Sequence, residues 1–194
     1  MTLRYDTRSR VSTYTQSWVS NADPDFGAFE SIATSVVGSG GTSTITFSSI
    51  PATYKHLQLR MISRGTGTAT FTIRVRLNGD TGSNYASHFL EGDGASTVAG
   101  GSTSANYIFL YVQPKSSALA NVFGGFVVDV LDYANTNKNK TIRHIGGYDA
   151  NGSGYVDLDS GLWMNSSAIT SIELTTGATS FAQYSHFALY GIKG

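Results

Sequence analysis

The segment YDANGSGYVDLD, from Tyr148 to Asp159, carries the side-chain oxygens best spaced for site chemistry. Asp149, Asn151 and Ser153 follow the spacing of the first half of an EF-hand calcium loop. The bidentate Glu that closes such a loop is missing, because Ser160 stands at that position. The segment is therefore either a calcium ligand set or the turn of a hairpin.

The turn is the better explanation. Asn151-Gly152 is the strongest short signal for a two-residue hairpin, since Asn and Gly both tolerate positive φ. The expected cross-strand pairs are Tyr148–Tyr155, Ile145–Leu158 and His144–Asp159. Opposed residues share a face of the sheet. We expect Ile145, Val156 and Leu158 on the inner face, and Tyr148, Tyr155, Asp157, Asp159 and His144 on the outer face.

In this register the carboxylates do not converge on one ion. Asp149 and Asp157 fall on opposite faces, about 10 Å apart at ~3.3 Å per residue. Calcium needs its oxygens at about 2.3–2.6 Å. The sequence thus predicts no metal ligands, and only a register shifted by a longer loop would restore the calcium hypothesis.

Catalytic signatures are missing as well. The four histidines, His56, His88, His144 and His186, lack metal-binding spacing and a neighbouring nucleophile motif. There is no Gly-x-Ser-x-Gly elbow and no phosphate loop. We expect no catalytic residue, no cofactor and no enzymatic activity, although a triad assembled from distant strands stays open.

The elements that must position these residues are strands. Leu57, Leu59 and Met61, for example, alternate with polar residues at the period of a half-buried strand. Eleven such segments are expected, at 31–37, 43–49, 54–64, 68–78, 83–91, 105–112, 121–133, 140–149, 154–164, 168–176 and 183–193. The pattern predicts an all-β, antiparallel β-sandwich over 29–194, with a jelly roll of about 10–11 strands as the first choice.

Residues 1–28 have no clear period and are predicted to form an extended N-terminal arm. The arm carries Arg4, Arg8 and Arg10, and its Trp18 would be costly to leave in water. We expect it to dock on its own domain or on a partner. Neither a signal peptide nor an apolar run of the ~20 residues needed to span a bilayer is found, so no membrane association is expected.

The composition excludes some chemistry and suggests contacts. The chain has no cysteine, a net charge of zero and only 13% charged residues. A hairpin of 54–64 and 68–78 around Gly65–Gly67 would place basic side chains on one face without a carboxylate: His56, Arg60, Arg64, Arg74 and Arg76, beside Gln58. Such a face is either solvated or a protein interface. Nucleic acid is not expected, because the face lacks an aromatic platform.

One strand is apolar on both sides. Tyr107, Phe109 and Tyr111 alternate with aliphatic residues, which is typical of a central strand covered on both faces. The aromatic face is expected to contact another subunit or to stack on a sugar.

Two segments carry a resemblance to known proteins. TSTITFSSIPATYKHLQLRMISRG (Thr42–Gly65) and SHFALYGIKG (Ser185–Gly194) resemble structural proteins of tailed bacteriophages. The resemblance implies a jelly-roll virion protein, often a homotrimer, that assembles in the bacterial host cytoplasm. Some such proteins are cement or decoration proteins on the capsid surface, and others are tail or fibre modules.

The expected function follows from the arm and this resemblance. It is a non-enzymatic cement protein that binds the major capsid protein or other virion subunits and stabilises the shell. The alternative is a tail fibre or receptor-binding module that recognises host surface glycans.

Overall fold

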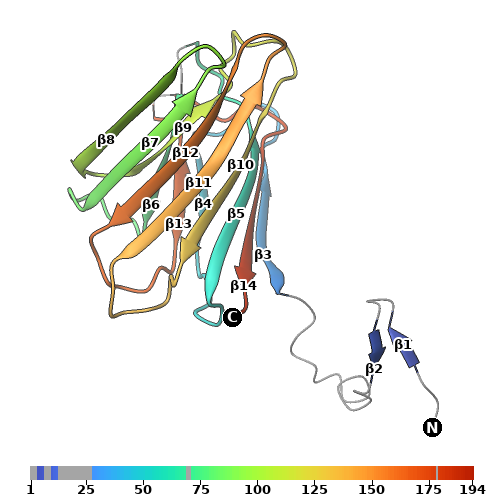
Figure 1. Ribbon diagram of the computed structural model, residues 1–194, viewed down its shortest axis with the longest axis vertical. Helices are drawn as coiled ribbons and strands as arrows, with labels where there is room; N and C mark the ends of the chain where they lie inside the picture. Colours follow the sequence, from blue (N-terminus) through green and yellow to red (C-terminus); the bar gives the residue numbers. More distant parts are fainter. Residues whose placement is uncertain (1–3, 7–9, 13–27, 69–70, 178) are drawn as a thin grey trace.

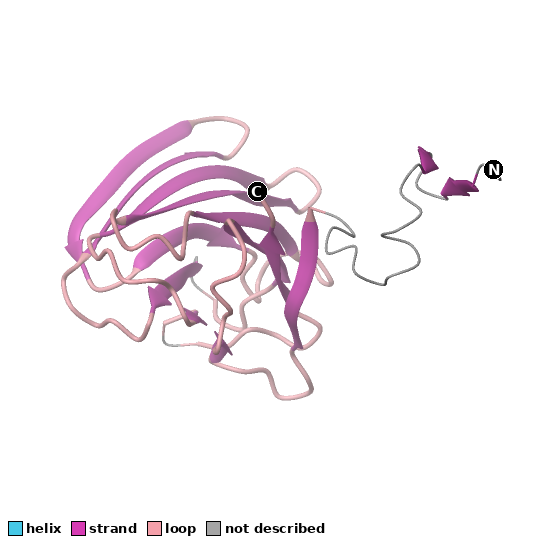
Figure 2. Cartoon of the chain, turned by 90° about the horizontal axis from the view of Figure 1, so that it is seen from below, coloured by secondary structure: helices cyan, strands magenta, loops and turns pink. Residues whose placement is uncertain are grey.

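The computed structural model describes residues 4–6, 10–12, 28–68, 71–177 and 179–194, and the regular elements among them are all β-strands (Figure 1). Two antiparallel sheets pack face to face, as Figure 2 shows, which confirms the predicted β-sandwich. No helix in the described parts of the chain is long and apolar enough to cross a membrane.

One sheet has eight strands and the other has four. In spatial order, the large sheet is β3 (Phe29–Val36), β14 (His186–Ile192), β5 (His56–Ser63), β10 (Gly124–Leu131), β11 (Lys140–Asp149), β12 (Gly154–Trp163), β7 (Tyr85–Gly92) and β8 (Thr97–Ala105). The small sheet is β4 (Thr44–Phe47), β13 (Ile172–Thr175), β6 (Phe71–Leu77) and β9 (Ile108–Gln113).

The pairing is that of a jelly roll. β3 pairs with β14, β4 with β13, β5 with β10 and β6 with β9, as in one long hairpin folded onto itself. The β14–β5 and β13–β6 pairs then join these strands into two four-stranded sheets. Two inserted hairpins, β7–β8 and β11–β12, extend the first sheet beyond β10.

The core lies between the sheets and follows the predicted alternation. Leu57, Leu59 and Met61 are each 2% exposed or less. Gly161 on β12 lets the sheets approach closely, because a Cβ there would lie 2.5 Å from Cγ2 of Ile108 on β9. Packing of this kind fixes how the inward side of β12 lies against β9.

Three predictions about strands were wrong. β5 and β6 do not form a hairpin, because the Gly65–Gly67 link crosses between the sheets; Gly65 N donates to Pro114 O and Thr66 N to Ser180 O. β9 is an edge strand rather than a central one. β8 was not predicted, because its sequence, TVAGGSTSA, has few apolar residues. It pairs with β7 and forms one edge of the large sheet.

The N-terminal segment contains two short strands, β1 (Arg4–Asp6) and β2 (Arg10–Ser12), which pair with each other in a sheet of their own. The first strand of the sandwich begins at Phe29.

Candidate functional site

The β11–β12 hairpin has the predicted register. Its pairs include Tyr148–Tyr155, Ile145–Leu158 and His144–Asp159. Asn151 and Gly152 take φ values of 59° and 100° at the tip, and Asp149 Oδ1 accepts a hydrogen bond of 2.7 Å from Asn151 N. The Asp149 carboxylate therefore stabilises the turn.

The two faces of this hairpin are the reverse of the prediction. The polar residues His144, Asp157 and Asp159 are buried, with 1%, 1% and 3% exposure. Ile145, Val156 and Leu158 are instead 57%, 67% and 54% exposed. Asp157 and Asp159 are thus not an exposed acidic edge.

The cause is Trp163, which lies on the same face of β12 as the two aspartates. Its indole stacks on Tyr85 in the core, with ring centroids 6.3 Å apart, and donates 2.7 Å from Nε1 to Asp80 Oδ2. Burying this ring turns the whole face inward. The sequence contains a signal for this orientation. Trp163 falls on the same face of its strand as the two aspartates, whereas the charged Arg143 falls on the same face as Ile145.

The buried polar residues form a compact cluster. His144 Nδ1 lies 2.9 Å from Asp157 Oδ2 and 3.0 Å from Asp159 Oδ2. The Phe126 ring stacks on the imidazole, with centroids 5.6 Å apart. Burial alone would lower the pKa of His144, but the two carboxylates outweigh it and raise the pKa to about 9. Burial raises the pKa of Asp157, against the effect of His144.

Part of the outer face of the large sheet is apolar. Ile145, Leu158 and Leu90 follow one another in register across β11, β12 and β7. The adjoining row of the register contains Val36, Ile62 and Val156. We call this set the apolar face; its six members, between 50% and 67% exposed, are Val36, Ile62, Leu90, Ile145, Val156 and Leu158.

An uncovered surface of this kind is unusual for a monomer. Isolated exposed aliphatic residues are common, but contiguous apolar patches usually mark an interaction site. Gly125 and Gly147 lie between Ile62 and Val156 in the register and add no side chains above the sheet. No side chain therefore stands between these two parts of the apolar face, and another broad surface could pack against both.

The predicted basic face does not exist as one surface, because β5 and β6 belong to different sheets. Arg60 lies on the large sheet, with its guanidinium 5.4 Å and 5.5 Å from the rings of Phe29 and Tyr190. Arg74 and Arg76 lie on the small sheet. Each sheet also has a carboxylate beside these basic residues. On the large sheet, Gln58 Nε2 donates to Asp129 Oδ1 at 2.9 Å. On the small sheet, Arg76 is 3.5 Å from Glu173.

Arg64 has a structural role. Its two terminal nitrogens donate four hydrogen bonds of 2.8–3.0 Å to backbone carbonyls of the loop between β9 and β10. The acceptors are Ser116, Ala118, Leu119 and Val122.

The aromatic residues of β9 contact their own sheet. Tyr107 and Phe109 meet edge to face at 4.7 Å, and the guanidinium of Arg74 covers the Tyr107 ring at 4.6 Å. Phe109 also lines a cavity of about 160 Å³ with Phe89. The side chain of Tyr111 lies outside the described part, as do those of Arg4 and Arg10 and the whole of Arg8 and Trp18.

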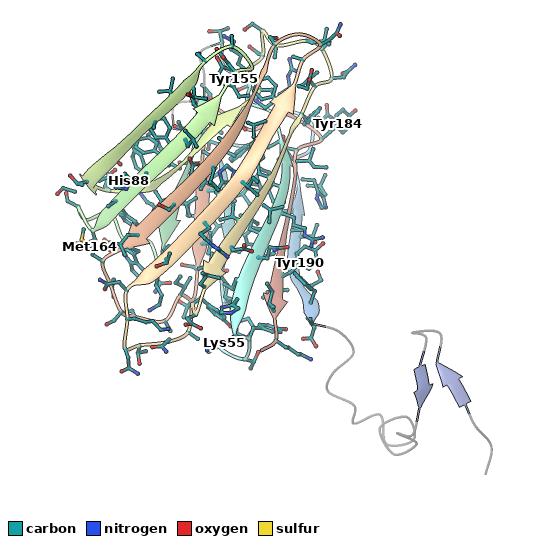
Figure 3. The ribbon with its side chains drawn as sticks, in the orientation of Figure 1. Lys55, His88, Tyr155, Met164, Tyr184 and Tyr190 are labelled. Atoms are coloured by element: carbon teal, nitrogen blue, oxygen red, sulfur yellow. The ribbon has the colours of Figure 1, made fainter. Side chains whose placement is uncertain are left out.

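A second surface feature lies where β12 begins, at the end of the molecule that carries the Tyr155 label in Figure 3. Tyr148 and Tyr155 lie side by side, with centroids 6.0 Å apart. Two cavities of about 390 and 240 Å³ are lined by this pair together with Ser153 and Gly154, and Asp93 and Asp149 line the larger one. We call this region the tyrosine end.

Comparisons of the chain with protein-family models, curated proteins and solved structures found no match.

Proposed function

We propose that this chain is a non-enzymatic structural protein of a tailed-bacteriophage virion, a cement or decoration protein on the capsid. Its jelly-roll body associates into a homotrimer through the apolar face. Its N-terminal arm, residues 1–28, contacts the major capsid protein or other virion subunits.

The observation that carries this proposal is the apolar face. Six branched aliphatic side chains stand at half exposure or more on one side of the large sheet, next to glycines. Covering them with a second copy of the chain would remove apolar area from water and stabilise the assembly by about 25 cal/mol per Å². A subunit that works by packing, rather than by chemistry, needs such a surface.

The arginines support a separate role for the first part of the arm. Residues 1–28 carry three arginines and three aspartates and are neutral as a whole, but all three arginines lie within the first ten residues, where Asp6 is the one carboxylate. Arginine pairs with carboxylates in bidentate geometry, so an acidic shell surface is the partner that suits it. Interfaces of this type depend on salt, since exposed ion pairs are screened.

Localisation on the virion tests the placement. We expect cryo-EM of purified virions to show three copies of the jelly roll in contact with capsid subunits, and a chain lacking residues 1–28 to fold but not attach. Density confined to the tail would contradict the capsid placement. Attachment of the truncated chain would contradict the role of the arm.

A tail fibre or receptor-binding module is the second candidate, and the tyrosine end favours it. Tyrosine rings stack on sugar rings, and nearby carboxylates and hydroxyls accept and donate hydrogen bonds to sugar hydroxyls. Selective glycan-array binding that is lost in Tyr155→Ala would support this candidate. Absence of binding at millimolar glycan would reject it.

A further inference from the structure

The cluster of His144, Asp157 and Asp159 has a geometry beyond that of an ion pair. One ligand atom from each residue lies within 4.8 Å of the other two. The nitrogen Nδ1 of His144 is 2.9 and 3.0 Å from the two aspartate oxygens. Donors bound at ~2.1 Å around one ion lie about 3.0 Å apart when the angle between them is 90°, and about 3.4 Å apart in the tetrahedral geometry typical of Zn²⁺. Two edges of the cluster thus come close to those of a coordination sphere, and the third is no longer than 4.8 Å.

The local charge also favours a cation. Glu91 on β7 pairs in register with Asp157 and faces the same side of the sheet. Three carboxylates therefore share this site with one imidazole. Among the described residues, Asp157 has no ion-pair partner other than His144.

Two buried atoms of the cluster lack hydrogen bonds. Neither His144 Nε2 nor Asp157 Oδ1 has a partner among the described residues. The Nε2 side is closed, since a Cβ on Gly146 would lie 2.8 Å from Nε2 and 2.2 Å from the Phe126 ring. An ion would therefore lie on the other side of the ring, where Nδ1 meets the carboxylates. A buried carboxylate with unused lone pairs is costly unless a proton or an ion meets them.

We propose that His144, Asp157 and Asp159 bind a divalent first-row transition-metal ion, Zn²⁺ or Mn²⁺, with Glu91 placed to complete the ligand set. One imidazole nitrogen with carboxylate oxygens suits these ions better than Ca²⁺ or Mg²⁺, which prefer oxygen alone. The ion would join β11, β12 and β7 inside the sandwich. Its role is structural, because the cavities of the tyrosine end are lined by other residues.

The test is a metal-loading experiment on the full chain. The protein is unfolded in a chelator and refolded with Zn²⁺, Mn²⁺, Ca²⁺ or no metal, because the site is closed in the folded state. After desalting, we expect about one equivalent of Zn²⁺ or Mn²⁺ by elemental analysis, and no Ca²⁺. The melting temperature should rise by roughly 5–10 °C at about a hundredfold excess over the dissociation constant.

Asp157→Asn should lose the metal and the melting shift, whereas Asp149→Asn should keep both. Asp149 is the matched control, since it lies on the same hairpin and is exposed. If Asp157→Asn does not fold, cobalt-loaded wild type still decides the matter, because four- or five-coordinate Co²⁺ in a protein site absorbs visible light much more strongly than octahedral aqueous Co²⁺. Wild type that refolds without retaining metal and melts identically in every sample would overturn the proposal. Equal retention by Asp157→Asn would do so too, and neither result bears on the virion role.

Discussion

Single side chains stabilise the irregular parts of this molecule. Arg64 is the clearest case, because one guanidinium binds four carbonyls of the 116–122 loop. Lys140 acts in the same way at the other end of the sandwich: its Nζ donates to the backbone oxygens of Asn135, Lys138 and Ser166 at 2.6–2.9 Å. Each cation replaces hydrogen bonds that water would otherwise supply.

Replacing Arg64 by alanine should therefore destabilise the fold. We expect the free energy of unfolding to fall by about 1–3 kcal/mol, because partly buried carbonyls lose charged donors. Urea denaturation measures the change. Arg143→Ala is the control and should cost less than about 0.5 kcal/mol, since exposed ion pairs contribute little. Equal losses in the two variants would contradict the role assigned to Arg64.

Asp132 should make stability depend on pH in the acid range. The ammonium groups of Lys138 and then Lys55 lower the pKa of Asp132 to about 2, from an ordinary value of 3.8. Because the folded-state pKa is the lower one, the stabilisation is complete above about pH 4 and is lost as the pH falls toward 2.

NMR titration of the Asp132 carboxyl and denaturation midpoints between pH 2 and 5 check this prediction. In Asp132→Asn the acid-induced loss of stability should be smaller than in wild type. An Asp132 pKa near 4 would show that the lysines do not lower the pKa of this carboxyl.

At the scale of elements, the period of two identified strands but did not decide which side of a strand faces inward. β11 and β12 carry apolar residues on both faces, so the register of the hairpin was predictable while the burial of His144 and Asp157 was not. The deciding contact, Trp163 on Tyr85, joins strands far apart in the sequence. The placement of β5 and β6 in different sheets could not be predicted either, because the sequence of their link resembles a hairpin turn.

The close approach of the two sheets gives an element-scale prediction. Gly161→Ala should lower stability by about 1–3 kcal/mol, because the new methyl group meets the Ile108 side chain at 2.5–3.1 Å. Gly38→Ala is the matched control, since a Cβ there has nothing within 4 Å and Gly38 lies outside the apolar face. Chemical denaturation of both variants provides the comparison.

A double-mutant cycle separates this clash from a general glycine effect. Gly161→Ala combined with Ile108→Ala should cost less than the sum of the two single changes. If the stability losses of the two single variants are fully additive in the double variant, the loss in Gly161→Ala does not come from the contact between β12 and β9.

For the molecule as a whole, the two sides of the large sheet have opposite characters. The inner side buries a hydrophobic core that gives way to charged groups near the β11–β12 hairpin, and the outer side exposes the apolar face. A monomeric β-sandwich rarely exposes such a surface, whereas a subunit of an assembly uses one to contact its neighbours. The sequence predicted that His144, Asp157 and Asp159 share a face, but it predicted neither their burial nor the apolar face, because both depend on which side of the hairpin faces inward.

Light scattering coupled to size-exclusion chromatography tests the central claim, that the apolar face joins copies of this chain. We expect wild type to elute with three times the 20.6-kDa chain mass, and Leu158→Glu with the mass of one chain, since a carboxylate cannot be buried there. Ser160→Glu, an exposed position on the same side of β12, should leave the trimer intact. A wild type that stays at 20.6 kDa at high concentration, or a Leu158→Glu variant that still forms trimers, would contradict the claim.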